Sequence, residues 1–306
     1  MPELPDLTVY QAALARVAKG KRLESLVCWN PFVLRTVSPS PADVSGQALL
    51  AVERLGKRIV LVFEGDLFIV VHLMIAGRFR WFENDTKPNK IVHATFKFES
   101  GILQLTEAST KKRASIAIYR GRENLAALDR GGLEIFNTSP TGSLTPRVSL
   151  NEFRQRLLLE NRTVKRALTD PTLFSGIGNA YSDEILHAAK LSPMRLTRSL
   201  DVQETARLFD AIVSTLTLWT ARLLAEFADK FPGPGQITAF RPDFAMHGKY
   251  GQPCPTCGAK VQRIAYADNE TNYCAKCQNE GRLLADRALS RLLKDDWPKR
   301  LEDIAE

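Results

Sequence analysis

The sequence predicts a multidomain α+β protein, with an N-terminal β-sandwich or barrel, a helical middle and a small cysteine-rich module. Three observations support this fold class. Short runs of β-branched and aromatic residues fill the first third of the chain, apolar residues recur at helical spacing from residue 150 to about residue 230, and four cysteines follow between residues 254 and 277. A chain of 306 residues, 44% of them hydrophobic, can bury more than one core.

The N-terminal strands are predicted from short runs bounded by glycine, serine or charged residues. These runs are residues 58–63 (RIVLVF), 67–72 (LFIVVH), 94–98 (ATFKF) and 102–105 (ILQL). Such a composition is typical of strands. Ahead of them, residues 7–19 carry apolar side chains at helical spacing, so a helix is expected beside the sheets. We therefore predict that residues 1–136 form the N-terminal domain.

Residues 137–149 (NTSPTGSLTPRVS) are rich in serine, threonine, proline and glycine, which predicts a linker or a domain boundary. Ser149 is a suitable N-cap for the next helix. We predict a helical domain over residues 150–239, in which the segment 205–227 forms a long helix that ends before the sequence FPGPG.

Two further segments complete the chain. We predict a cysteine module over residues 240–279 and an amphipathic helical extension over residues 280–306, where leucines alternate with charged residues. Packing of this extension on the helical domain is the preferred interpretation, and binding of a partner is the alternative.

The charge balance is basic, with a formal net charge of +8 and a pI near 9.3. This suits a polyanionic partner, although ordinary soluble proteins can be equally basic. No apolar run reaches the roughly 18 residues that span a bilayer. The sequence MPELPDLTVY is acidic and lacks the apolar core of a secretory signal. We therefore expect a cytoplasmic protein without a membrane partner.

The cysteine module contains two CxxC pairs separated by sixteen residues, formed by Cys254, Cys257, Cys274 and Cys277. In a chain without an export signal, this pattern indicates a metal site rather than disulfides. Four thiolates close a tetrahedral site and leave no open position for chemistry. We predict one structural zinc ion, with iron or a redox role as the alternative. A zinc ribbon alone is weak support for DNA binding.

A glycine-containing turn, Gly176-Ile177-Gly178-Asn179, separates two predicted helices. Its two glycines allow a tight turn and close approach to another chain. The turn leads into a helix N-terminus, where free N–H groups and the helix dipole favour a phosphate, and Asn179 can add a donor. A helical hairpin without a ligand is the alternative.

The N-terminal sequence offers a nucleophile. Pro2 permits removal of Met1, which leaves a secondary amine. An α-amino group titrates near pH 8, against about 10.4 for lysine, so more of it is unprotonated at neutral pH. Attack on an electrophilic sugar carbon would give an iminium, which is an electron sink. Glu3 and Asp6 can shuttle protons nearby. The alternative is that these residues are only a polar, rigid start to the first helix.

Together, these motifs resemble the formamidopyrimidine-DNA glycosylase and endonuclease VIII family. The sequence MPELPD is close to the family's MPELPE, and the other matches follow in family order: His72-Leu73 with Ala76-Gly77-Arg78, residues 131–136 (GGLEIF), residues 168–181 with GIGNAY, and the four cysteines preceded by Gly251-Gln252-Pro253. The resemblance implies an N-terminal β-sandwich, a helix–two-turns–helix domain and a C-terminal zinc finger. It also implies a monomer that acts beside the nucleoid on double-stranded DNA containing a damaged base or an abasic site.

The resemblance also implies roles for single residues. Pro2 would displace the damaged base as the nucleophile, Glu3 would be the general acid and base, and Lys57 would contact the phosphate beside the lesion. The base would be flipped out of a kinked duplex, and the iminium would support β- and δ-elimination. The helical domain would contact phosphates through Lys165 and Asn179, the latter in the turn with Gly176 and Gly178.

Several positions depart from the family pattern. Asp6 stands where the family has a second glutamate, and Ile75, preceded by Met74, stands at the intercalating methionine. The loop at residues 107–116 (EASTKKRASI) has no aromatic residue and offers Lys111, Lys112 and Arg113 instead.

In the zinc finger, the family's phosphate-binding arginine corresponds to Asn269, for which Arg263 or Lys276 could compensate. These departures concern the substrate more than the reaction. Oxidised purines are the expected lesions, and oxidised pyrimidines, abasic sites or bulkier lesions are the alternatives.

The sequence thus predicts a bifunctional DNA glycosylase and abasic-site lyase of base excision repair. The alternative is a damaged-DNA or abasic-site binding protein that keeps the scaffold without catalysis. A zinc-ribbon protein that acts through protein contacts of its C-terminal helix is a third hypothesis, and it leaves the N-terminal motif unexplained.

Overall fold

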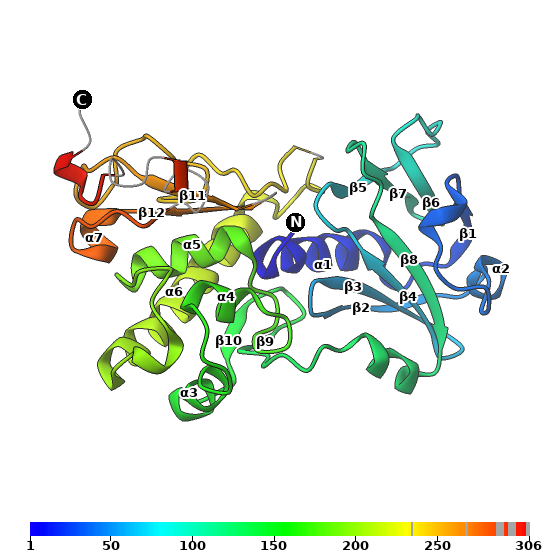
Figure 1. Cartoon of the computed structure of the whole chain (residues 1–306). Coiled ribbons are helices and arrows are strands. Elements are labelled where there is room, and N and C mark those ends of the chain that lie inside the picture. The colour runs from blue at the N-terminus through cyan, green and yellow to red at the C-terminus, as the bar shows by residue number, and fades with distance from the viewer. Residues whose placement is uncertain (234, 267–268, 286–290, 293–297, 304–306) are drawn as a thin grey trace. The chain divides into compact units, whose positions relative to one another are not determined.

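The computed structural model describes residues 1–233, 235–266, 269–285, 291–292 and 298–303. The chain forms two compact units (Figure 1). Unit 1 consists of Met1–Arg130, Asn137–Thr145 and Trp219–Thr238, and unit 2 consists of Gly131–Phe136, Pro146–Leu218 and Ala239–Glu306.

Unit 1 begins with helix α1 (Leu4–Ala18), which contains the helix expected from residues 7–19. Its start is fixed by a capping box, in which the backbone N–H of Glu3 donates to the Asp6 carboxylate at 3.0 Å. Pro5, in the first turn, lacks an N–H that the helix could not have used. The helix therefore begins directly after Glu3.

Two antiparallel sheets form the body of unit 1. One has the strand order β2-β3-β4-β8 and the other has the order β1-β6-β7-β5. The first sheet contains β2 (Leu49–Leu55), β3 (Arg58–Phe63), β4 (Leu67–His72) and β8 (Ser115–Arg120). The second contains β1 (Leu23–Cys28), β5 (Gly77–Phe82), β6 (Val92–Phe98) and β7 (Gly101–Glu107). All four predicted strands are present, and the predicted sandwich is confirmed.

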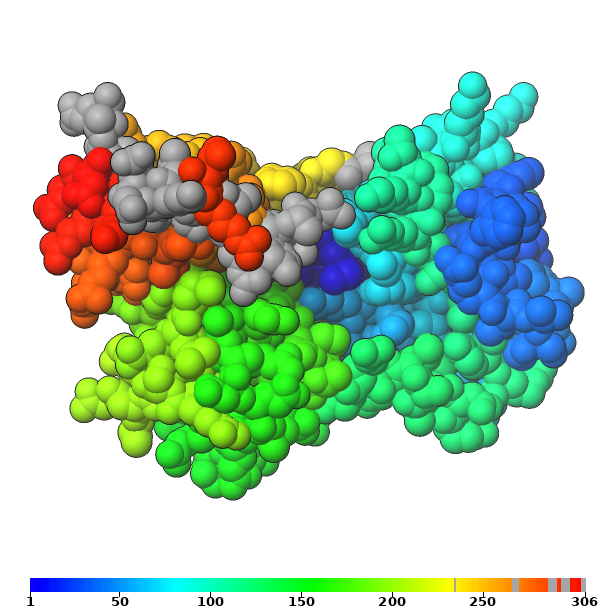
Figure 2. Space-filling model, in the orientation of Figure 1, coloured from blue at the N-terminus to red at the C-terminus, as the bar shows by residue number. Residues whose placement is uncertain are grey.

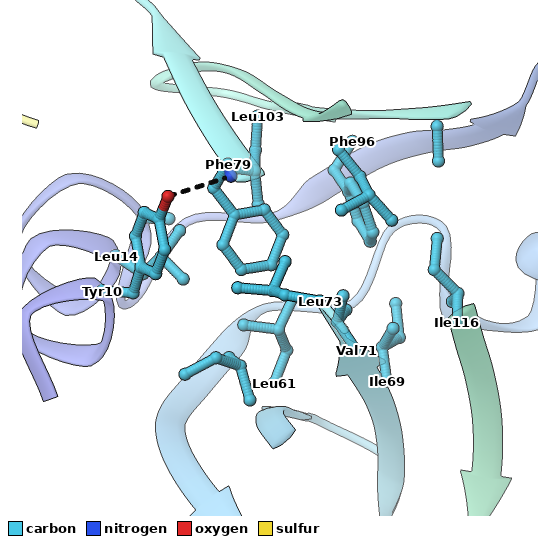
Figure 3. Packing of buried hydrophobic residues seen from close by; sticks show 14 of the residues in the cluster. Tyr10, Leu14, Leu61, Ile69, Val71, Leu73, Phe79, Phe96, Leu103 and Ile116 are labelled. Carbon is cyan, nitrogen blue, oxygen red and sulfur yellow. Dashed lines mark hydrogen bonds between the residues drawn. The ribbon is translucent and has the colours of Figure 1, made fainter. Parts of the chain in front are cut away.

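The core of unit 1 lies between these sheets and α1 (Figure 3). Leu61 and Val71 of the first sheet share one cluster with Phe79 and Phe96 of the second. Tyr10 of α1 closes one end, where its ring meets Phe79 edge-on at 5.3 Å and its hydroxyl accepts the Phe79 N–H at 3.3 Å. This packing fixes the start of α1 against the sandwich.

Unit 2 contains the helices α3 (Leu150–Leu157), α4 (Val164–Thr169) and α5 (Asn179–Ala188), together with most of α6 (Val202–Glu226). Ser149 caps α3 as expected, because its hydroxyl accepts the Glu152 N–H. The strands β11 (Gln262–Tyr266) and β12 (Asn269–Tyr273) and the helix α7 (Ala275–Asn279) form the cysteine module. The predicted helical and zinc-finger architecture is confirmed.

The remaining elements are short. Unit 1 has η1 (Pro31–Val33), α2 (Pro41–Val44) and η2 (Arg122–Leu128), and unit 2 has η3 (Thr197–Ser199) and η5 (Leu301–Asp303). Residues 137–149, expected as a linker, include most of a small two-stranded sheet of β9 (Phe136–Thr138) and β10 (Leu144–Pro146).

Two described parts of the C-terminal segment differ from the predicted amphipathic helix. The Leu283 N–H donates to the Lys299 carbonyl at 2.8 Å, and Arg282 pairs with Arg300 as an isolated bridge. Because these backbone groups bond across the segment rather than along it, residues 281–285 and 298–300 are not helical. Residues 291–292 are helical, as predicted, and the prediction for residues 286–290, 293–297 and 304–306 lies outside the described residues. The segment packs on the cysteine module through Leu284, whose N–H donates to the Tyr273 hydroxyl at 2.7 Å.

Among the described residues, only α6 is long and apolar enough to cross a membrane by length and composition. Of its most apolar window, 44% is buried inside the fold. Leu208, Ile212 and Leu216 belong to this buried face. A core helix of a globular protein passes the same test, so α6 is weak support for a membrane span.

Candidate active site and zinc module

The first residues of unit 1 bring two carboxylates to a buried position beside Pro2. Pro2 is buried, and Glu3 and Asp6 are only 3% and 2% exposed. The capping box explains their placement, because the carboxylates at the N-terminus of α1 meet its free N–H groups and the positive end of its dipole. The local sequence that starts the helix therefore also builds the acidic part of the site.

Two cations share the electrostatic surroundings of the chain-terminal amine. Burial lowers the pKa of the Met1 amine, Glu3 and Asp6 oppose this shift, and the positive charges of Arg78 and Lys57 add to it. Burial likewise lowers the pKa of the Lys57 ammonium, and Glu3 opposes the shift. The predicted residues Pro2, Glu3, Asp6 and Lys57 are thus brought together, with Arg78 as an additional member.

Arg78 is the strongest site residue that sequence analysis left without a role. It lies at the start of β5, and its guanidinium donates to the carbonyls of Ile75, Gly77 and Ile237 at 3.0, 2.7 and 2.6 Å. These bonds hold a positive charge next to the chain start. The available signal was its place in the Ala76-Gly77-Arg78 segment, just after the predicted strand that ends at residue 72.

His72 ends β4 and belongs to the same charged region. Burial lowers its pKa to about 4, with the positive charges of Arg58 and Lys57 acting in the same direction. The imidazole is therefore neutral near pH 7. A neutral ring can donate or accept one hydrogen bond without adding to the positive charge around Lys57.

The turn between β4 and β5 projects an aliphatic side chain. Met74 has a left-handed backbone (φ +53°) and is half-buried, whereas Ile75 is 59% exposed. Gly77 is required here, because a Cβ at this position would lie 2.2 Å from the Leu73 carbonyl oxygen. Of the two residues predicted as candidates for intercalation, Ile75 has the exposed position that a wedge needs.

The loop after β7 is closed by a buried carboxylate. Glu107 is 2% exposed and accepts the backbone N–H groups of Arg113 and Ala114 at 2.9 and 3.1 Å. The Lys112 ammonium donates to the Glu107 carbonyl at 2.5 Å. Lys112 and Arg113, both predicted to bind DNA, are therefore held as exposed cations on a closed loop.

In unit 2, the glycine-containing turn has the expected form. Gly176 has a φ of +81°, which favours glycine, and Gly178 is the N-cap of α5. The Asn179 side-chain amide donates to the Glu270 carbonyl at 2.9 Å and so ties α5 to β12. This bond uses one of its donors within the unit.

Lys165 was predicted to contact a phosphate, but it is 8% exposed. Its ammonium donates to the Asn179 carbonyl and the Ser182 hydroxyl, both at 3.0 Å, and to the Asp183 carboxylate at 2.5 Å. Because an ammonium has three donors, all are used within unit 2. In this arrangement, Lys165 positions the N-terminus of α5 and has no donor left for a phosphate.

Asp183 and Glu184 extend this network, and sequence analysis missed both. The other Asp183 oxygen lies 2.8 Å from His247 Nδ1, and Glu184 accepts the backbone N–H groups of Ala245, Met246 and His247 at 2.8–2.9 Å. Burial raises the pKa of Glu184, and these N–H groups oppose the shift. The two acids fasten the segment before the cysteine module to α5.

The four predicted metal ligands form one cluster. Their sulfur atoms all lie within 4.8 Å of one another, with Cys254 and Cys277 at 4.0 Å and Cys257 and Cys274 at 3.4 Å. Tetrahedral zinc with Zn–S bonds of about 2.3 Å separates its sulfurs by about 3.8 Å, so the cluster fits. The module is a site for one structural zinc ion. Asn269 lies on β12, but its side chain lies outside the described part of the chain.

Three family profiles match the chain in order. They are the Formamidopyrimidine-DNA glycosylase N-terminal domain over residues 1–115, the Formamidopyrimidine-DNA glycosylase H2TH domain over residues 141–221 and the Zinc finger found in FPG and IleRS over residues 251–279.

Curated relatives cover most of the chain. A formamidopyrimidine-DNA glycosylase of Desulfitobacterium hafniense is 30% identical over 282 residues, which are 91% of this chain and 100% of the relative. One from Latilactobacillus sakei is 29% identical over 280 residues, which are 91% of this chain and 98% of the relative.

Solved structures share the fold. The LlFpg protein in complex with a THF-DNA and an inhibitor superposes with a TM-score of 0.77 at 23% identity, covering 91% of this chain and 100% of that chain. The Lactococcus lactis Fpg in complex with an abasic site containing DNA gives 0.76 at 23% identity, covering 90% and 99%.

The sandwich with its buried chain start, the helix–two-turns–helix unit and the zinc finger, taken with these matches, define a DNA glycosylase of base excision repair. More narrowly, the chain belongs to the formamidopyrimidine-DNA glycosylase family.

Proposed function

We propose that the protein is a bifunctional glycosylase and abasic-site lyase that excises an oxidised or otherwise damaged base through a Schiff base at Pro2. The main support for this proposal is the buried start of the chain. There, Glu3 and Asp6 lie beside Pro2, and the charges of Lys57 and Arg78 act on the terminal amine. Removal of Met1 would give the Pro2 amine these surroundings. Because they lower the pKa of an amine, more of it would be unprotonated and nucleophilic near pH 7.

The proposed reaction begins when the Pro2 nitrogen attacks the sugar C1′. The new C–N bond displaces the damaged base, which leaves with the electrons of its glycosidic bond and takes up a proton. Protonation of the ring oxygen by Glu3 opens the sugar and gives the iminium. Loss of a C2′ proton then expels the 3′ phosphate, and a second elimination expels the 5′ phosphate. Hydrolysis of the remaining imine regenerates the amine.

The proposed DNA contacts lie on both units. In unit 1, Lys57 would bind the phosphate beside the lesion, Ile75 would wedge into the duplex, and Lys112 and Arg113 would contact the backbone. In unit 2, the turn with Gly176, Gly178 and Asn179 and the strand that carries Asn269 would face DNA, with Lys165 holding the turn rather than binding a phosphate.

Asp6 is the proposed positioning residue of the site. Its carboxylate accepts the Glu3 N–H and so fixes the residue next to Pro2. The partner would be double-stranded DNA with a damaged base or an abasic site, such as the DNA bound in two of the Lactococcus lactis Fpg structures. The protein would act as a monomer in the cytoplasm, associated with the nucleoid.

Borohydride trapping on a duplex with one abasic site tests the proposal. We expect a covalent adduct that maps to Pro2. Glu3→Gln should lower the single-turnover nicking rate by about 10²–10⁴-fold, because it removes the proton donor. It should leave the melting temperature nearly unchanged, since the amide can still accept at the cap. Tight binding of the abasic duplex without any adduct would contradict the proposal and favour the non-catalytic alternative.

A further inference from the structure

Unit 1 has a second surface with the chemistry to bind DNA, formed by two aromatic and three basic residues. Trp29, directly after β1, and Phe32, in η1, are 52% and 79% exposed. Arg35, Lys112 and Arg113 are also exposed. We call this set the aromatic–basic surface. Neither ring contributes to the core of the sandwich, so the fold itself does not account for them.

Backbone and side-chain bonds hold the two aromatic residues in place. The Trp29 backbone N–H donates to the His93 carbonyl, and its indole N–H donates to the Thr95 hydroxyl, both at 2.9 Å. The Phe32 N–H donates to the Asn30 side-chain oxygen at 3.1 Å. The rings therefore sit on a rigid turn, which lowers the entropy cost of stacking on a ligand.

His93 connects this turn to the loop after β7. Because the Asn30 oxygen accepts from Phe32, its amide nitrogen faces His93 Nδ1, at 3.0 Å, and donates to it. Burial lowers the pKa of His93, although the nearby Glu107 opposes the shift. A neutral imidazole with an accepting Nδ1 agrees with both observations. The turn with the rings and the basic loop thus share one buried, uncharged support.

The basic residues lie along the same edge of unit 1. Leu34 forms a parallel bridge with Ile116, and the Arg35 N–H donates to the Ile116 carbonyl at 2.8 Å. The turn therefore runs beside the residues that lead from the loop into β8, and both segments are visible on the face shown in Figure 2, coloured blue and blue-green. The buried Glu107 carboxylate accepts backbone N–H groups of the loop and does not pair with the side chains of Lys112 or Arg113 through these bonds. The exposed side chains of the loop therefore keep their positive charge.

This surface is one strand away from the candidate active site. β8 begins at Ser115, which pairs with His72 of β4, and the pKa of His72 is lowered first by burial and then by the charges of Arg58 and Lys57. Exposed rings on the same edge as exposed cations fit a nucleobase with its phosphates better than a protein or a membrane. A base whose partner has been flipped out is the unpaired base nearest to such a site.

We propose that the aromatic–basic surface binds the unpaired base opposite the flipped nucleotide, with Phe32 and Trp29 stacking on it and the cations binding the flanking phosphates. This inference rests on the proposed function, since flipping of a damaged base by a glycosylase leaves the opposite base without a partner, as an abasic site does. Loss of the Phe32 ring should weaken binding of such DNA about tenfold. It should leave binding of fully paired DNA unchanged.

The test uses a duplex with 2-aminopurine opposite a tetrahydrofuran abasic analogue, which cannot be cleaved. Wild-type protein should quench the 2-aminopurine fluorescence by stacking. Phe32→Ala should lose most of the quenching and bind about tenfold more weakly, whereas Phe32→Trp should retain both. Val37→Ala is the matched control, because Val37 is an apolar side chain of the same segment with 94% exposure and lies outside the surface.

Unchanged quenching and affinity in Phe32→Ala would overturn the inference. Borohydride trapping on a single-stranded abasic oligonucleotide separates this failure from that of the proposed function. An adduct with both proteins, together with unchanged quenching, rejects the stacking site alone. Absence of an adduct with wild-type protein rejects the lyase mechanism, whatever the fluorescence shows.

Discussion

Two buried charged clusters, one in each unit, use the same residue types to different ends. In unit 1, Lys57 and Arg78 act against a buried amine, whose pKa they help to lower. In unit 2, every donor of the Lys165 ammonium meets an acceptor, and the Asp183 carboxylate binds both Lys165 and His247. The first cluster holds positive charges together with a potential nucleophile, and the second neutralises its charges by hydrogen bonds.

This difference teaches how to separate a reactive cluster from a structural one. A cluster whose donors are all matched resists change, because loss of one partner leaves a buried charge behind. A cluster with displaced pKa values around an amine is poised for proton transfer. Mutations of Lys57 or Arg78 in the first cluster should therefore mainly affect activity, whereas mutations of Lys165 or Asp183 in the second should mainly affect stability.

The largest effect on stability is expected from Asp183→Ala. The side chain of Asp183 is fully buried, and its loss strands the Lys165 ammonium without its anion. We expect the free energy of unfolding to fall by about 3–5 kcal/mol, measured by urea denaturation of the zinc-loaded protein.

The double variant Asp183→Asn with Lys165→Met is the control for this prediction. It removes both charges, so it should recover much of the lost stability. Trapping at Pro2, measured per folded molecule, should stay within about threefold of wild type, which is far smaller than the loss of about 10²-fold or more expected from a catalytic residue. If Asp183→Ala instead abolished trapping and left the unfolding curve intact, the comparison between the clusters would fail.

The sequence predicted the sandwich and the zinc site well, because both depend on local signals. Residues 58–63 are rich in β-branched and aromatic residues, which by themselves indicate a strand, and the CxxC spacing places two thiolates on each turn. The contents of the clusters depend on long-range contacts. Asp183 and His247 are 64 residues apart, and no local pattern pairs them.

The sequence did contain a weak indication of the cluster formed by Lys165, Asp183 and His247 in unit 2. Asn179, Ser182 and Asp183 are spaced so that they share one face of α5, which predicts a polar stripe on that helix. The sequence could not show that this stripe is buried and faces Lys165, because burial is decided by packing with α4 and β12. Resemblance alone therefore suggested a phosphate contact for Lys165, where the structure shows an internal ion pair.

A smaller effect is expected from the protonation of His72 in unit 1. Its pKa is about 4 in the folded protein, against an ordinary value of 6.5. Between these values the unfolded chain binds more protons, so stability is full above about pH 7 and falls as the pH decreases toward 4. The loss should reach about 2 kcal/mol between pH 7 and pH 5.

His72→Gln should flatten this part of the stability profile, measured by urea denaturation at steps of half a pH unit. Other groups also titrate near pH 4, so the difference between variant and wild type above pH 5 is decisive. Parallel profiles over that range would show that the imidazole is not held neutral by its surroundings.

The smallest expected effect is on DNA affinity, and it compares one lysine of unit 1 with one lysine of unit 2. Lys112 is exposed on a closed loop, whereas Lys165 is buried and fully bonded. If Lys112 binds a phosphate, Lys112→Met should weaken binding of an abasic-analogue duplex a few-fold and make the slope of log affinity against log salt shallower by about 1. Lys165→Met should leave that slope unchanged and lower the stability of unit 2 instead. A change of slope in Lys165→Met equal to that in Lys112→Met would show that the Lys165 ammonium leaves Asp183 to bind DNA, which would return it to the role that the family resemblance implied.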